Sequence, residues 1–209
     1  MNDPATARLP MPPHATFSDI LSDAERDALL AWTLRHEAAL KPATFVGGVY
    51  DPANRLSRSL PRSLNGPWQV PLRRRVADLF PQLLDAAKTR PFELAEIDLK
   101  LVAYGDGDFI AAHSDTVTGS RRGSTDRVLA AIYYFHQEPK SYSGGELRLY
   151  PFGAAGAETD PFVAVEPQAN SLTVFPAWAM HSVTPVSVPS RRYEHSRFAV
   201  NCWLNRPAG

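Results

Sequence analysis

Two stretches in the first half of the chain repeat their apolar residues at the interval of a helix. Residues 17–40 place apolar side chains three or four positions apart, and Ser22 and Glu25 have the spacing of a capping box. Residues 71–88 carry a second apolar stripe, which Pro81 is expected to kink or end. The pattern therefore predicts two helices in this half.

From about residue 93 the pattern changes to short apolar or alternating runs, separated by turn-forming residues. The runs are "ELAEIDLKLVAYG", "RVLAAIYYF", "GELRLYPF", "FVAVEP", "SLTVFP" and "RFAVNCWL". Strands that follow one another without intervening helices favour an antiparallel sheet. The expected fold is mostly β, a jelly roll packed against N-terminal helices. We expect one domain over 1–209, with a helical part and loop over 1–92, in which 41–66 form a loop or a short hairpin, and a β core over 93–205.

Composition narrows the classes of function. Lys and Arg number 22 and so do Asp and Glu, a zero net charge that argues against a broad nucleic-acid or membrane surface. No apolar stretch approaches the roughly 18–20 residues of a membrane helix, and residues 1–17 lack the pattern of a signal peptide. With a single cysteine, Cys202, no intrachain disulfide forms. We expect a cytoplasmic protein; its oligomeric state is not visible in the sequence.

One histidine and one aspartate stand two positions apart in "AAHSDTVTG". In an extended segment the side chains of His113 and Asp115 reach the same face. His181 is the best candidate for a third ligand, because it follows an apolar run with small neighbours. Two histidines and a carboxylate form the facial triad of non-haem Fe(II) oxygenases. An isolated His-x-Asp pair is more often structural, so this hypothesis depends on further groups in the chain.

An arginine in the last apolar run supplies such a group. Arg197, Asn201 and Trp203 alternate onto one face of this run. An inward arginine is costly unless it pairs with an anion, and its guanidinium suits a carboxylate. Arg197 is therefore a candidate to bind the far carboxylate of an iron-chelating dicarboxylate. An internal ion pair with Glu146 or Asp98 is the alternative.

Several motifs then follow one another in order along residues 95–204. They are Tyr104, "HSD" at 113–115, "RVLAAIYYF" at 127–135, "SGGELRLY" at 143–150, "FPAWAMHSVTPV" at 175–186 and "RFAVNCW" at 197–203. This set resembles the prolyl 4-hydroxylase branch of the Fe(II)/2-oxoglutarate-dependent oxygenases. The resemblance implies a double-stranded β-helix core and iron ligation by His113, Asp115 and His181. It also implies Fe(II), 2-oxoglutarate as cosubstrate and O₂, with ascorbate as a candidate stimulant.

The resemblance implies roles for residues around the metal as well. Arg197 would bind the distal carboxylate of 2-oxoglutarate, and Tyr134 would donate its hydroxyl to the same group. Tyr104 would line the cosubstrate pocket and Trp203 would pack beside the site; ordinary strand packing is the alternative for both tyrosines. The family usually carries its arginine nearer to the second histidine, where this chain has Arg191. Arg197 is preferred because it begins the strand that contains Trp203.

The expected activity is hydroxylation of a C–H bond by a 2-oxoglutarate-dependent dioxygenase, with a prolyl or other residue of a peptide or protein as the preferred substrate. A free amino acid or small metabolite is the alternative substrate. A jelly-roll protein that binds a metal or ligand without catalysis is the non-enzymatic alternative, and a zinc hydrolase is a further one. Segments 41–66 and 116–126 are candidates to clamp a peptide. The arginines of these two segments would favour an acidic substrate, or they are simply solvated. Segment 116–126 is also a candidate lid, with a plain loop as the alternative, and residues 187–196 are expected to form an inserted loop.

Overall fold

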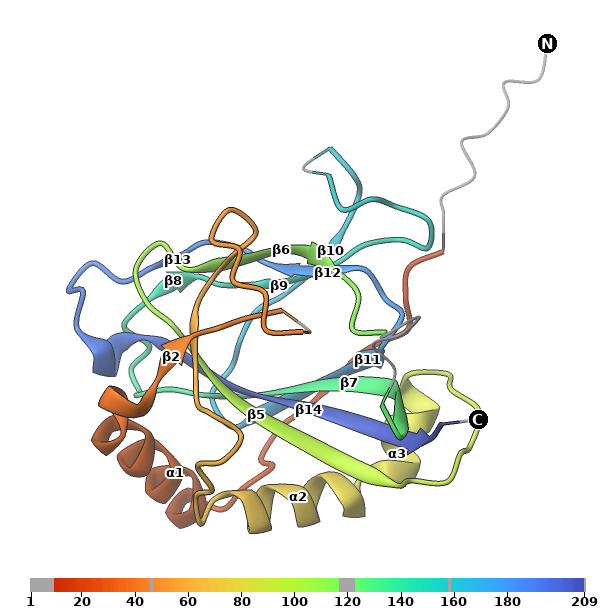
Figure 1. Ribbon diagram of the computed structural model, residues 1–209, viewed down its shortest axis with the longest axis horizontal. Coiled ribbons are helices and arrows are strands. Elements are labelled where there is room, and N and C mark those ends of the chain that lie inside the picture. The colour runs from red at the N-terminus through yellow and green to blue at the C-terminus, as the bar shows by residue number, and fades with distance from the viewer. Residues whose placement is uncertain (1–9, 46, 117–122, 158, 209) are drawn as a thin grey trace.

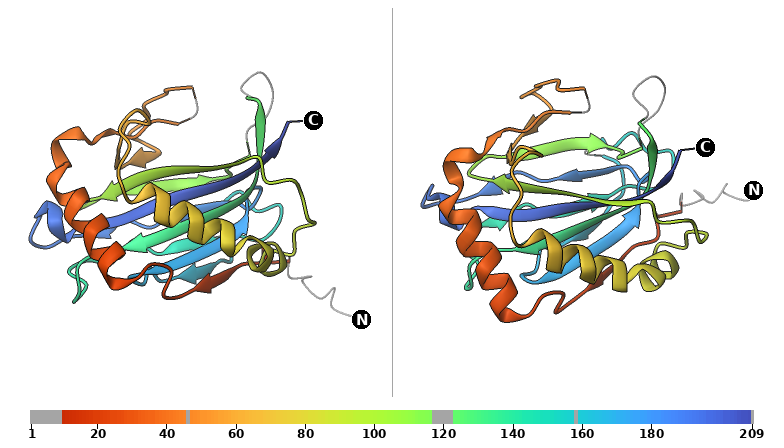
Figure 2. Two further views of the ribbon diagram at one scale, coloured as in Figure 1. Left: turned by 90° about the horizontal axis from the view of Figure 1, so that it is seen from below. Right: turned by 60° about the horizontal axis from the view of Figure 1, so that its bottom comes forward.

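Two antiparallel sheets make up the β core, and the helices cover the outer face of the larger one (Figures 1 and 2). The computed structural model describes residues 10–45, 47–116, 123–157 and 159–208. The larger sheet has the strand order β1 (Ala15–Phe17), β11 (Ser171–Pro176), β7 (Thr125–Phe135), β14 (Arg197–Pro207), β5 (Glu96–Tyr104), β4 (Arg58–Ser59) and β2 (Lys41–Pro42). This arrangement confirms the mostly β fold that the strand pattern predicts.

The smaller sheet closes the other side of the core. Its strand order is β10 (Val163–Val165), β9 (Leu147–Leu149), β12 (His181–Val183), β6 (Phe109–His113) and β3 (Arg55–Leu56). A separate pair is formed by β13 (Val186–Ser187) and β8 (Ser143–Gly144). The long strands of the larger sheet thus supply one wall of the space between the sheets, and short strands supply the other.

The helices pack beneath the larger sheet. They are α1 (Asp23–Arg35), α2 (Gln69–Asp78) and α3 (Phe80–Ala86), with short 3₁₀ helices at Glu37–Ala39 and Tyr193–His195. The capping box predicted for Ser22 and Glu25 is present and starts α1. Pro81 stands in the first turn of α3, directly after the break from α2, so the predicted interruption is confirmed.

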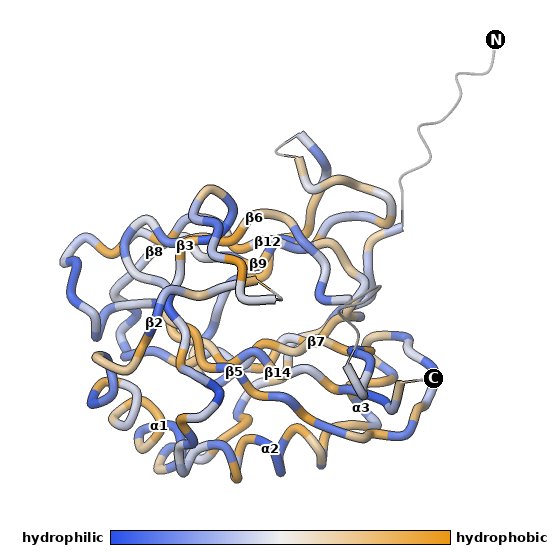
Figure 3. The backbone as a smooth tube through the Cα atoms, in the orientation of Figure 1, coloured by the Kyte–Doolittle hydropathy of each residue, from blue (hydrophilic) through white to orange (hydrophobic). Residues whose placement is uncertain are grey.

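Side chains of β14 alternate between two apolar clusters. Phe198, Val200 and Cys202 belong to the cluster that faces the helices, whereas Ala199 and Trp203 belong to the cluster between the sheets. Figure 3 shows the apolar positions gathered along β5, β7 and β14, above the helices. Because strand alternation sets this division, the face that bears Arg197 is turned toward the space between the sheets, as the sequence predicts.

The N-terminal half contributes more β structure than the sequence predicts. The helix expected over 17–40 begins only at Asp23, and β1 ends at Phe17. β1 pairs with β11, and the strands β2, β3 and β4 within 41–66 extend both sheets. The helical part is therefore interleaved with the β core. Most of the expected lid, residues 117–122, lies outside the described residues.

The helices of the described part of the chain are all too short or too polar to cross a membrane.

Candidate metal and cosubstrate site

Two strands of the smaller sheet bring the candidate histidines together. His113 is the last residue of β6 and His181 the first residue of β12, and the two are directly paired across the antiparallel strands. Their ring centroids lie 4.2 Å apart. The pairing of two strands far apart in the sequence therefore places two imidazoles side by side.

The carboxylate of Asp115 completes the cluster. The backbone N–H of Asp115 donates to the Ala177 carbonyl at 2.9 Å, which holds the residue beside the turn that precedes β12. Its Oδ2 lies 3.7 Å from His181 Nε2. One ligand atom from each of His113, Asp115 and His181 lies within 4.8 Å of the others. The sequence motif and the strand pairing thus gather a donor set that suits an Fe(II) ion.

Backbone carbonyls hold both imidazoles in the form that a metal needs. The Nδ1 atoms of His113 and His181 lie 2.9 Å from the carbonyls of Ala111 and Ala179. A carbonyl only accepts, so each Nδ1 carries the hydrogen and each Nε2 keeps a lone pair for the ion. Burial, and then the neighbouring His181, lower the pKa of His113 well below its usual value. The imidazole of His113 is therefore neutral at neutral pH, the state that binds metals.

Arg127 and Trp203 flank the carboxylate. Burial alone would raise the pKa of Asp115, but the two histidines, the Trp203 indole N–H and Arg127 together lower it. Arg127 lies 3.8 Å from Asp115 through Nη1 and Oδ1, and its guanidinium carbon lies 3.9 Å from the centroid of the Trp203 ring. The structure places Trp203 beside the cluster as expected. Sequence analysis did not single out Arg127, although a cation at the start of an apolar strand is a usable signal.

Arg197 lies fully buried on the other side of the cluster, with only 1% of its surface exposed. Its Nε donates to the Gly145 carbonyl at 2.8 Å, while its buried Nη2 has no hydrogen-bond partner among the described residues. Gly145 has φ +73, and a Cβ there would lie 2.6 Å from Arg197 Cδ. The chain thus leaves room for the guanidinium and leaves one of its nitrogens unsatisfied, a costly arrangement without an anion.

Tyrosines surround this guanidinium. Its carbon lies 4.9 Å from the ring centroid of Tyr104, the residue paired with Arg197 across β5 and β14, and 5.1 Å from that of Tyr134. The buried hydroxyls of Tyr134 and Tyr142 have no hydrogen-bond partner among the described residues. Sequence analysis missed Tyr142, which stands in a loop just before β8 and carries no pattern of its own. The buried Nη2 of Arg197 and the hydroxyl of Tyr134 beside it are therefore candidates to bind a buried acceptor.

The alternative partners of Arg197 are engaged elsewhere. Glu146 accepts a hydrogen bond from Thr184, and Asp98 forms a two-point ion pair with Arg62. Arg191, which stands at the family's usual arginine position, is mostly exposed and lies 3.4 Å from Asp106. Arg197 thus lies fully buried in the pocket that contains the metal donors, whereas Arg191 lies at the surface.

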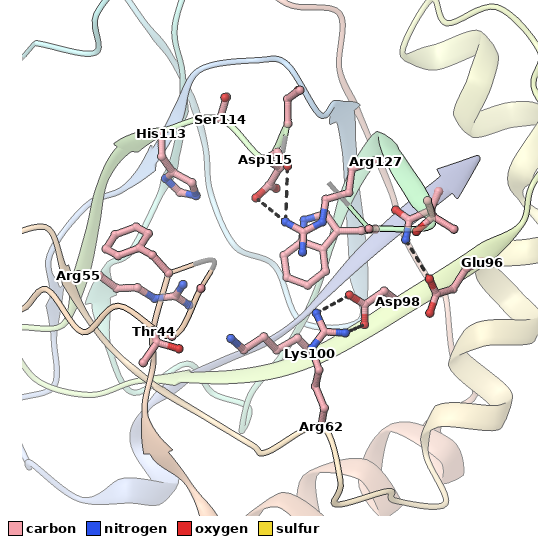
Figure 4. A pocket seen from close by; sticks show the side chains of 18 residues that line it. Thr44, Arg55, Arg62, Glu96, Asp98, Lys100, His113, Ser114, Asp115 and Arg127 are labelled. Atoms are coloured by element: carbon pink, nitrogen blue, oxygen red, sulfur yellow. Dashed lines mark hydrogen bonds and ion pairs between the residues drawn. The ribbon is translucent and has the colours of Figure 1, made fainter. Parts of the chain in front are cut away.

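A cavity of about 670 Å³ opens beside the metal donors (Figure 4). His113, Asp115, Arg127 and Trp203 form its inner end. Its outer part is lined by residues from the segment after β2, from the exposed edge of β5 and from the segment before β7. The cavity therefore joins the metal donors to the protein surface. A smaller pocket, lined by His113, His181, Tyr104, Arg197 and Trp203 among others, lies deeper between the sheets.

Comparisons with known proteins agree with this geometry. The family model described as the 2OG-Fe(II) oxygenase superfamily matches residues 99–205, and the chain belongs to this superfamily. Membership implies Fe(II), 2-oxoglutarate and O₂, and the cluster of His113, Asp115 and His181 supplies a fitting donor set. The predictions of family, fold and cofactors are thereby confirmed.

Two curated relatives are named as PKHD-type hydroxylases. An uncharacterised one from Synechocystis sp. is 41% identical over 138 residues, which are 65% of this chain and 45% of the relative. One from Acidovorax ebreus is 32% identical over 95 residues, covering 44% of this chain and 38% of the relative. The chain thus spans less than half the length of these relatives.

Solved structures share the fold at low sequence identity. A Pseudomonas putida prolyl-4-hydroxylase superposes with a TM-score of 0.66 at 20% identity, covering 94% of both chains. A prolyl hydroxylase from Trichoplax adhaerens, solved with a hypoxia-inducible-factor peptide, gives a TM-score of 0.68 at 15% identity and covers 92% of this chain and 83% of its own. The jelly roll of this chain is therefore the double-stranded β-helix of prolyl hydroxylases.

Proposed function

We propose that the chain is a 2-oxoglutarate-dependent dioxygenase that hydroxylates a residue, preferably proline, in a peptide or protein. The observation that carries the proposal is the unsatisfied Nη2 of Arg197, buried beside Tyr134, whose hydroxyl is also unsatisfied, in the pocket that contains the metal donors. A protein that only binds a metal has no use for such a buried cation. A zinc hydrolase would leave the same groups unexplained.

In this proposal the side chains divide into three groups. His113, Asp115 and His181 hold Fe(II) through two imidazole Nε2 atoms and a carboxylate oxygen. Arg197 and Tyr134 hold the distal carboxylate of 2-oxoglutarate, with Tyr104 packed against the guanidinium. Bound Fe(II), with 2-oxoglutarate and O₂, supplies the oxidative decarboxylation that gives succinate and carbon dioxide and oxidises the substrate C–H bond.

The position of the larger cavity favours a peptide over a free small molecule. It runs from the metal donors to exposed residues such as Glu96 and Arg62, so an extended chain has a path across the site. The prolyl hydroxylases that share the fold suggest proline as the modified residue. A free amino acid is the second candidate, because the deeper pocket beside the donors is much smaller than the outer cavity.

Mass spectrometry of a peptide panel tests this function. Proline-containing peptides and free proline are incubated with the protein, Fe(II), 2-oxoglutarate, ascorbate and air, and succinate is measured in parallel. We expect a gain of one oxygen on a peptide, matched by succinate, and loss of both with Asp115→Ala. Oxygen gain on free proline and on none of the peptides would show that the substrate is a small molecule. Neither oxygen gain nor succinate under any condition would overturn the enzymatic proposal.

A further inference from the structure

The wall of the large cavity carries an excess of cationic side chains. Arg55, Arg62, Lys100 and Arg127 line it, together with the three carboxylates of Glu96, Asp98 and Asp115. Glu96 accepts a hydrogen bond from the side chain of Asn205. Arg62 is neutralised by Asp98, with nitrogen–oxygen distances of 2.8 and 2.7 Å. Arg127 is balanced by the nearby carboxylate of the metal cluster. Two of the four cations thus have an internal counter-charge.

Arg55 and Lys100, here named the cationic pair, have no carboxylate partner within ion-pair distance among the described residues. Arg55 is only 8% exposed, and its Nε donates to the neutral hydroxyl of Ser57 at 3.0 Å. Lys100 lies opposite Asn201 across β5 and β14, on the face turned toward the cavity. Figure 4 shows the guanidinium of Arg55 and the ammonium of Lys100 pointing toward the same part of the cavity.

This arrangement is unfavourable without an anion. A buried or half-buried cation loses hydration, and a second cation beside it adds repulsion. Burial, followed by the charge of Arg55, lowers the pKa of Lys100 to about 8. Lys100 is still largely protonated at neutral pH, so the pair presents two positive charges to whatever enters the cavity. Cations held in this way recruit carboxylates.

We propose that the cationic pair binds a carboxylate of the substrate, so that preferred peptides carry an acidic group close to the hydroxylated residue. The inference rests on the proposed function and adds the substrate class to it. The carboxylate has two sources in a peptide, an aspartate or glutamate side chain and the free C-terminus. It is separate from the distal carboxylate of 2-oxoglutarate, because Arg197 lines the deeper pocket and not this cavity, whereas Lys100 lines this cavity and not the deeper pocket; Arg55 lines both.

Selection from a mixed peptide library tests the proposal and requires no identified substrate. The immobilised protein, loaded with Fe(II) and 2-oxoglutarate under nitrogen, is offered peptides with a central proline and Glu, Gln, Lys or Ala at each flanking position. One half of the library has a C-terminal amide and the other a free carboxylate. Mass spectrometry identifies the retained peptides. We expect glutamate to be enriched over glutamine about tenfold at one or more positions, or the free C-terminus over the amide by a similar factor.

Three variants show whether the cationic pair causes the enrichment. Lys100→Gln is expected to reduce it severalfold, and Lys100→Glu is expected to favour lysine peptides instead. Lys88→Gln is the matched control, because Lys88 is an exposed lysine paired with Asp85 at the end of α3 and does not line the cavity. Equal retention of glutamate and glutamine peptides, an enrichment that survives Lys100→Glu, or no retention above the bare matrix would each overturn the proposal.

The same samples separate this inference from the proposed function. On admission of air, retained acidic peptides that gain oxygen support both. Retained acidic peptides that gain none support the carboxylate site and contradict the hydroxylase. Oxygen gain on neutral and acidic peptides alike supports the hydroxylase and contradicts the carboxylate site.

Discussion

His113 and His181 are direct partners across β6 and β12, and each donates its Nδ1 hydrogen to the carbonyl two residues before it. The two hydrogen bonds turn both Nε2 atoms toward one point, beside the carboxylate of Asp115. The metal donors are therefore oriented by the backbone of the sheet before an ion arrives. Such preorganisation favours binding because little conformational freedom remains to be lost.

Metal binding should stabilise the fold. At a free Fe(II) concentration about one hundred times the dissociation constant, the gain is about 2.7 kcal/mol, which raises the thermal midpoint by several degrees. The measurement is anaerobic thermal unfolding with and without Fe(II), followed by chelation. His181→Ala should abolish the metal-dependent shift, whereas His14→Ala, which changes a histidine outside the cluster whose Nδ1 lies 2.9 Å from the Pro12 carbonyl, should keep it. A shift that persists in His181→Ala would place the ion elsewhere.

Arg197 and Arg191 should differ sharply in their effect on 2-oxoglutarate. Loss of one partner of a buried charge pair costs about 2 kcal/mol or more, so Arg197→Gln should raise the KM for 2-oxoglutarate about 30-fold or more. Arg191→Gln removes only an exposed arginine beside Asp106 and should change the KM little. Steady-state succinate formation measures both. The reverse ranking would show that Arg191 is the cosubstrate ligand.

Trp203 should increase the affinity for the metal ion through its contact with Asp115. Trp203→Phe keeps an aromatic ring under Arg127 but removes the N–H that faces the carboxylate. Loss of such an outer contact typically weakens metal affinity about 10–100-fold. Trp32→Phe is the control, because Trp32 packs against His36 and Trp68 on the helical side of the core. Anaerobic metal titration should show weaker binding by Trp203→Phe than by Trp32→Phe. Equal metal affinities of the two variants would contradict this role of Trp203.

The affinity for acidic peptides should fall at alkaline pH. The pKa of Lys100 is lowered from 10.5 to about 8, first by burial and then by Arg55, Arg62 and Arg127, with Asp98 acting in the opposite direction. In the free protein the destabilising charge is present below pH 8 and is relieved as the pH rises toward 10.5, so folding stability gains from this group over that window.

Peptide binding follows the opposite trend, because it needs the ammonium. A bound carboxylate raises the pKa of Lys100, and affinity should therefore decline above about pH 8, by at most tenfold per pH unit for one proton. Lys100→Arg should flatten the profile, since arginine stays charged throughout. Binding titrations of one acidic peptide from neutral to alkaline pH measure this. An affinity of the unaltered protein that does not change with pH would show that the Lys100 ammonium does not bind the peptide.

Local patterns in the sequence predicted the parts of the fold and site that depend on neighbours along the chain. Alternation in the last strand correctly placed Arg197 and Trp203 on the face opposite Cys202. The capping box at Ser22 and the interruption at Pro81 were also predicted correctly. Each of these features is set by backbone geometry within a few residues, which a single sequence contains.

Features that depend on pairing between distant strands were not predictable in this way. β1 is a strand of three residues that ends shortly before α1, and its pairing with β11 makes it a strand. The contact of Arg127 with Trp203 needs the register of β7 against β14, and that register shifts at a bulge after Leu204. The convergence of Arg55 and Lys100 needs two sheets to close on one cavity. The register of paired strands and the packing of the two sheets depend on the whole fold. Patterns within a single sequence therefore do not determine them.

Anomalous diffraction from crystals grown under nitrogen with Mn(II) and 2-oxoglutarate shows directly where the metal and the cosubstrate bind. We expect one strong manganese peak between His113, Asp115 and His181, with density for 2-oxoglutarate reaching from the metal to Arg197. A manganese peak that lacks any of these three ligands, or 2-oxoglutarate bound away from Arg197, would contradict it.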